Sequence, residues 1–84
     1  MPDLAPKLLE AFANQLAALL RGEYKAYALP WVAAASRERV LEPLPAATRA
    51  AIFQGLRAAA AEGTDGVATS AAKVLARCAG DLGY

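Results

Sequence analysis

The sequence contains no histidine and only one cysteine, Cys78, among 84 residues. Histidine is the side chain that most often acts as a general acid or base near neutral pH, and it is the commonest metal ligand. Without it the chain cannot build a Ser-His-Asp or Cys-His site, and its scattered carboxylates show no metal-ligand spacing. The sequence therefore predicts a protein that is not an enzyme and that holds neither a metal nor a cofactor.

The ionisable and thiol groups that remain offer little reactive chemistry. Cys78 falls on the apolar side of a predicted helix, with no base or cationic cluster beside it in the sequence. We therefore expect a buried thiol rather than a nucleophile. Glu38 and Glu42 are one helical turn apart and lie among arginines, which is typical of a solvated charged surface rather than of an acid–base pair.

A long apolar segment is also missing. The longest uncharged apolar run covers the eleven residues 26–36 and is interrupted by Pro30, whereas a membrane-spanning helix needs about 20 apolar residues. The single cysteine excludes an intramolecular disulfide and suits a reducing compartment. The preference for alanine and arginine over asparagine and lysine is typical of a GC-rich genome. We expect a cytoplasmic protein of bacterial or phage type that makes no membrane contact.

Residues that favour β-strands are scarce. Only four valines, one isoleucine and two phenylalanines are present, which argues against a sheet. Alanine supplies 23 of the 48 apolar residues, and alanine favours helices that pack closely. We therefore expect a single all-α domain over residues 1–84. A chain this short hides only about 60% of its surface on folding, so association with a partner or a second copy would help to stabilise it.

Apolar residues recur at intervals of three and four along most of the chain, which predicts amphipathic helices. The pattern indicates a compact bundle of three to four short helices, over about 4–21, 31–42, 45–62 and 66–79, with a short helical or kinked segment at 23–29. Pro30 is expected in the first turn of the second helix, because a proline further inside a helix removes a hydrogen bond and clashes with the preceding turn.

Two details of the helices predict how they pack. The apolar positions expected to face the core from the first helix are Ala5, Leu9, Phe12, Leu16 and Leu19, flanked by Leu8 and Leu20. Gly55 interrupts the third helix, where glycine destabilises a helix by about 1 kcal/mol relative to alanine. We expect this glycine because another helix crosses close to its backbone.

The segment around Pro30 is the most informative candidate site, since Tyr24, Tyr27 and Trp31 supply three of the six aromatic residues within eight positions. Tyrosine and tryptophan are enriched at protein interfaces. A core short of large side chains could equally use Trp31 and one tyrosine to close the bundle. The candidate partner-binding residues are Tyr24, Tyr27, Trp31, Arg21, Lys25 and Arg37.

The sequence thus favours a non-catalytic protein-binding module: a small accessory subunit, an adaptor or an inhibitor, in a complex with another protein, in a homodimer, or in both. The alternative is a DNA-binding regulator that uses the third and fourth helices as a helix-turn-helix. The start of the fourth helix, 67–70, carries no long polar side chain that could read bases, and the net charge is only +1. Both features argue against nucleic acid as the partner.

Overall fold

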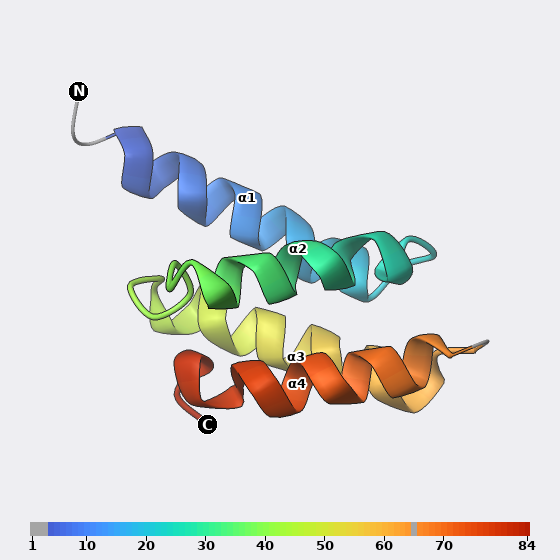
Figure 1. The fold of residues 1–84 in the computed structure, drawn as a ribbon. Helices are drawn as coiled ribbons and strands as arrows, with labels where there is room; N and C mark the ends of the chain where they lie inside the picture. Colours follow the sequence, from blue (N-terminus) through green and yellow to red (C-terminus); the bar gives the residue numbers. More distant parts are fainter. Residues whose placement is uncertain (1–3, 65) are drawn as a thin grey trace.

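The computed structural model describes residues 4–64 and 66–84, and within these ranges the chain forms helices and no strand (Figure 1). The helices are α1 (Leu4–Leu20), α2 (Lys25–Arg37), α3 (Ala46–Glu62) and α4 (Val67–Leu82). The predicted all-α bundle is therefore confirmed. Asp65 and the side chains of residues 1–6, including that of Ala5, lie outside the described part of the chain.

The helices pack in a ring in which each contacts two others. α3 packs against α1 and α4, and α2 packs against α1 and α4. The Cα radius of gyration is 12.0 Å, which matches the value of about 12 Å expected for a folded domain of this length. The first half of α1 extends beyond the other three helices (Figure 1).

The core lies between the helices and is closed at one end by the α2–α3 connection. Each helix contributes large buried side chains, and the connection adds two leucines. The largest fully buried side chains are Leu20, Val32, Leu41, Ile52, Leu56, Cys78 and Leu82. Alanines fill the remaining helix contacts, namely Ala13, Ala17, Ala28, Ala59 and Ala71. The alanine-rich composition thus serves close helix packing, because small side chains let helix backbones approach one another.

The second predicted helix, over 31–42, is placed wrongly along the chain. α2 begins at Lys25 and contains Pro30, so the segment 23–29 is neither a separate turn nor the end of α1. Pro30 deprives only the carbonyl of Ala26 of its helical hydrogen bond. Both residues are exposed, so water can satisfy that carbonyl and the proline is tolerated inside the helix.

α2 also ends earlier than predicted, at Arg37 rather than at residue 42. Arg39 adopts a left-handed conformation, with φ of 58°. Its N–H donates to the carbonyl of Ser36, and the N–H of Val40 donates to the carbonyl of Ala35. These two hydrogen bonds end the helix in a common C-terminal capping motif. The sequence does not predict this helix end, because the left-handed position holds an arginine instead of the usual glycine.

The other two predicted helices differ from the structure mainly at their ends. α3 starts at Ala46 with Pro45 as its N-cap, one residue later than predicted. α4 starts one residue later than predicted and runs through Gly80 to Leu82, three residues beyond the predicted end. It stops there because Gly83 is left-handed, with φ of 91°. The N–H of Tyr84 then donates to the carbonyl of Ala79 at 2.8 Å.

The core-facing side of α1 is only partly as predicted. Leu16 and Leu20 are buried, but Leu8, Phe12 and Leu19 are 66%, 42% and 38% exposed. The remaining buried residues of α1 are the alanines Ala13 and Ala17. The prediction is confirmed for Leu16 and Leu20, and Leu9 is partly buried against the core. It is wrong for Leu8, Phe12 and Leu19, because these side chains lie at the surface.

Gly55 lies where α1 and α3 cross. A Cβ atom at residue 55 would lie 2.9 Å from the Cβ of Leu20 and 3.2 Å from the carbonyl oxygen of Ala17. Real Cβ atoms do not approach other heavy atoms this closely, so the crossing of α1 and α3 requires glycine here. The expected close approach at Gly55 is confirmed.

We predict that Gly55→Ala destabilises the fold by about 1–3 kcal/mol, because the added methyl group overpacks the crossing by more than the gain in helix propensity. Gly80→Ala is the matched control, since a Cβ at this helical glycine meets nothing within 4 Å. We expect the control to stabilise the protein by up to about 1 kcal/mol. Urea unfolding followed by circular dichroism measures both changes. Equal effects of the two substitutions would contradict the close crossing.

Candidate functional site

The large apolar side chains that remain exposed are concentrated on α1 and α2. Among the described residues, six of the seven belong to these helices or to the turn between them. The six are Leu8, Phe12, Leu19, Tyr24, Tyr27 and Trp31, and we call them the α1/α2 face. The seventh, Tyr84, stacks on Phe53 of α3 with the ring centroids 4.0 Å apart.

The spacing of these residues places them on one continuous surface. Leu8, Phe12 and Leu19 are four and seven residues apart, which is one side of an α-helix. Tyr24, Tyr27 and Trp31 follow the same rule at the start of α2, at intervals of three and four. Because α1 and α2 pack side by side, the two rows of side chains adjoin each other.

Two ring contacts hold the aromatic side chains of the face. Phe12 and Trp31 meet edge to face, with centroids 5.9 Å apart and planes at 84°. Tyr24 and Tyr27 lie 6.0 Å apart at 50°. Edge-to-face and tilted pairs at these distances are attractive, so the contacts restrict the rotamers of exposed rings. The surface is therefore ordered before any partner arrives.

The sequence leaves open whether these aromatic residues lie in the core or at the surface, and in the structure they lie at the surface. Tyr24, Tyr27 and Trp31 are 57%, 71% and 59% exposed. None of them closes the core, where Leu20, Val32 and other aliphatic side chains lie instead. The aromatic group expected from the sequence is therefore a surface feature.

The three candidate cations make different local contacts. Arg21 lines a shallow hollow with Asn14 and Ala51, between α1 and α3. The Nζ atom of Lys25 donates to the carbonyl of Gly22 at 2.8 Å, which ties the side chain back to the preceding turn. Arg37 is exposed at the last position of α2. Among the six candidate residues, all within the described part of the chain, ring contacts are shown for the aromatic residues only.

The α1 half of the face is what sequence reasoning missed. Leu8, Phe12 and Leu19 fit a core stripe as well as the buried residues do, because α1 carries two overlapping apolar rows. Spacing along α1 does not separate the two rows. The buried row is fixed by where α3 crosses, with Gly55 against Leu20 and the backbone of Ala17.

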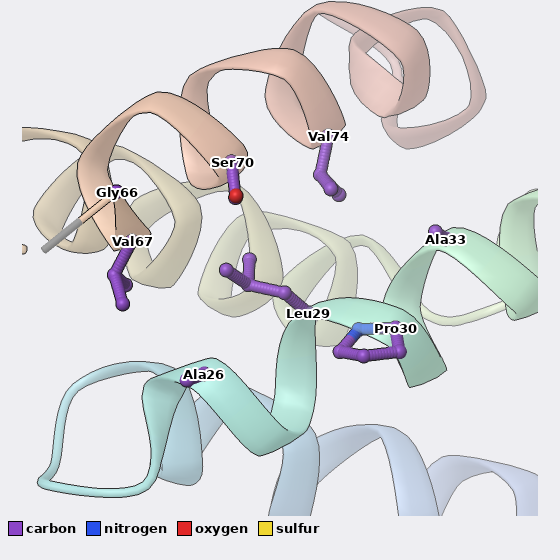
Figure 2. Close-up of a pocket in the computed structure, with 8 residues that line it drawn as sticks. All are labelled: Ala26, Leu29, Pro30, Ala33, Gly66, Val67, Ser70 and Val74. Carbon is purple, nitrogen blue, oxygen red and sulfur yellow. The ribbon is translucent and has the colours of Figure 1, made fainter.

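A pocket lies between α2 and the first half of α4 (Figure 2). Its volume is about 380 Å³ and its walls are mostly apolar and small. The lining residues are Ala26, Leu29, Pro30 and Ala33 from α2 and Gly66, Val67, Ser70 and Val74 from α4. Small side chains on both helices leave this part of the contact open.

The opposite end of the α2–α4 contact is closed by a polar link. The hydroxyl of Ser36 donates to a carboxylate oxygen of Asp81 at 2.5 Å. A short hydrogen bond to a charged acceptor is among the stronger ones in proteins. It joins the last turn of α2 to the last turn of α4 and fixes their register beside the core.

Cys78 lies next to this link and is fully buried. Burial is the largest influence on its thiol and raises the pKa above the ordinary value. The hydrogen bond with the Ser36 hydroxyl comes next and lowers the pKa, the negative charge of Asp81 raises it, and the charge of Arg77 lowers it least. The thiol is therefore protonated near neutral pH and behaves as a small apolar side chain, as predicted.

In the α3–α4 pair, which the sequence offers as a helix-turn-helix, the two arginines of α3 make contacts within the chain. The Nε atom of Arg49 donates to the carbonyl of Leu44 at 3.0 Å. The guanidinium of Arg57 lies 5.9 Å from the centre of the Phe53 ring. In α4, Arg77 and Lys73 are exposed and line a hollow with Ser70 and Val74.

Within residues 4–64 and 66–84 no three His, Cys, Asp or Glu side chains are grouped so that they could hold a metal ion. In the same ranges no helix combines the length and the apolar character needed to cross a membrane. Comparison of the chain with protein-family models, with curated proteins and with solved structures finds no match.

We predict that Cys78 makes the fold less stable above pH 9. The pKa of the thiol is higher in the folded than in the unfolded chain, so its contribution is fully present below the ordinary pKa of 9.0 and is lost as the pH rises through the folded value. Urea unfolding at pH 7 and pH 10.5, compared between the natural chain and Cys78→Ala, isolates this contribution. An identical loss in both proteins would contradict it.

Proposed function

We propose that this chain is a non-catalytic protein-binding module that acts through the α1/α2 face. It serves as a small accessory subunit, an adaptor or an inhibitor in the cytoplasm of a bacterium or of a phage-infected cell. The observation that carries the proposal is the concentration of exposed aromatic and leucine side chains, including the chain's only tryptophan, on one side of two adjacent helices.

The size of the face supports this role. If a whole large side chain offers about 150–250 Å², the exposed parts of the six side chains amount to roughly 500–830 Å². The largest apolar patch on a typical monomer is about 300–600 Å² and is often functional. A patch of this size is hydrated at a free-energy cost that a partner removes by covering it.

The composition and order of the face also fit binding. Trp31, Tyr24 and Tyr27 are of the types that contribute most to binding energy at interfaces. The contact of Phe12 with Trp31 holds the larger ring in place, so little side-chain entropy is lost when a partner binds. The tyrosine hydroxyls can hydrogen-bond a partner or water at the edge of the contact.

The absence of reactive groups supports binding rather than turnover. The sequence has no histidine, and the one thiol is buried with a raised pKa. The remaining oxygen groups that could act as a base or a nucleophile near neutral pH are carboxylates and hydroxyls. Such groups need activating neighbours for catalysis.

We predict that Tyr27→Ala combined with Trp31→Ala abolishes capture of a stoichiometric protein partner from bacterial or phage-infected lysate by the tagged full chain. Both side chains are more than half exposed, so the double variant should keep its far-UV circular dichroism and lose less than about 1 kcal/mol of stability. Mass spectrometry of the captured material measures the result.

Tyr84→Ala is the matched control, since Tyr84 is as exposed as Trp31 but its ring stacks on Phe53 of α3, outside the α1/α2 face. This variant should capture the partner as the natural chain does. A double variant that still captures the partner, or that unfolds, would refute the assignment of the face. Binding to random duplex DNA that falls steeply between low and physiological salt would instead support the DNA-binding alternative.

A further inference from the structure

We infer that the α1/α2 face, when no other protein occupies it, is covered by a second copy of this chain in a two-fold symmetric dimer. The inference rests on the proposed binding role of the face and names the partner that the structure itself supplies. Other partners would then compete with the second copy for the same side chains.

The exposed area of the face suits a dimer. The exposed parts of the six side chains, roughly 500–830 Å² per copy, are comparable with the 800 Å² or so that each partner contributes to a standard stable interface. Two copies that pair through this face would bury about twice that area. The face thus supplies most of the surface that a stable dimer needs.

The shape of α1 also favours a two-fold dimer. The first half of α1 extends beyond the bundle (Figure 1), and none of the side chains of residues 7–12 is buried. Leu8 lies in this first half of α1, Phe12 contacts Trp31 of the same chain, and α2 exposes Tyr27 and Trp31. In a two-fold pair, the extension of each copy can lie on α2 of the other, so a single symmetric contact covers both parts of both faces.

The charge of the face is also compatible with a dimer. The side chains of the face are uncharged, and so is Gln15, which lies on the same side of α1 between Phe12 and Leu19. A face without charge can meet its own copy without bringing like charges together, which otherwise costs several kcal/mol. The net charge of +1 adds no appreciable repulsion between copies. A charged partner such as nucleic acid would find no complementary groups on this surface.

The only tryptophan of the chain, Trp31, lies within the face and reports directly on its occupancy. We expect light scattering to give a mass that rises from 8.7 kDa toward twice that value as the full chain is concentrated from the low micromolar range. Over the same range, the emission of Trp31 should shift to the blue and its quenching by acrylamide should fall at least twofold.

Single substitutions in the α1/α2 face test whether the two copies contact each other there. Leu8→Ser in the extension and Tyr27→Ser on α2 should each raise the dimer dissociation constant about tenfold or more while keeping the helical circular dichroism. Tyr84→Ser, which changes an exposed ring outside the face, should leave the dissociation constant unchanged. A Leu8→Ser chain that dimerises normally would overturn the proposed use of the extension.

Two further results would overturn the dimer. One is a mass that stays at 8.7 kDa at all accessible concentrations. The other is a doubled mass with no change in the quenching of Trp31, because the copies would then pair through another surface. Both results leave the broader binding role to be judged by partner capture, so the failure of the dimer and the failure of the proposed function are distinguishable.

Discussion

The close crossing of α1 and α3 at Gly55 is the constraint on which the rest of the molecule depends. At this point the backbone of α3 lies against Leu20 and Ala17, with no room for a Cβ. The absence of a side chain at Gly55 leaves room for Leu20, so the row of α1 that holds Leu20, Ala17 and Ala13 is turned inward. The larger side chains of the neighbouring row, among them Leu8 and Phe12, are then directed away from α3. The exposed apolar surface is thus a consequence of tight packing elsewhere.

The two sides of α2 differ in burial. On one side, Val32 and Ser36 are buried, and the bond from Ser36 to Asp81 holds α2 to α4. On the other side, Tyr27 and Trp31 stay exposed next to α1. Changes at the exposed rings can therefore affect association without disturbing the core, and this separation makes the proposed role experimentally accessible.

The sequence predicts the helical class, the extents of α1 and α3, the tight contact at Gly55 and the burial of Cys78, because each depends on local pattern or composition. It misplaces α2, because Pro30 normally marks a helix start and the left-handed position that ends α2 holds an arginine. The sequence does not show which of the two apolar rows of α1 faces the core, or whether Trp31 lies in the core or at the surface. Those outcomes depend on which helix lies opposite, and spacing along one helix does not contain that information.

The orientation of α1 is therefore the central claim, and leucine substitutions at two positions of this helix test it most directly. Leu16 is 3% exposed and Leu8 is 66% exposed. Leu16→Ala should lower the free energy of unfolding by about 2–5 kcal/mol, whereas Leu8→Ala, measured in dilute solution, should change it by less than about 0.5 kcal/mol. Comparable losses at the two positions would mean that Leu8 belongs to the core and would contradict the account.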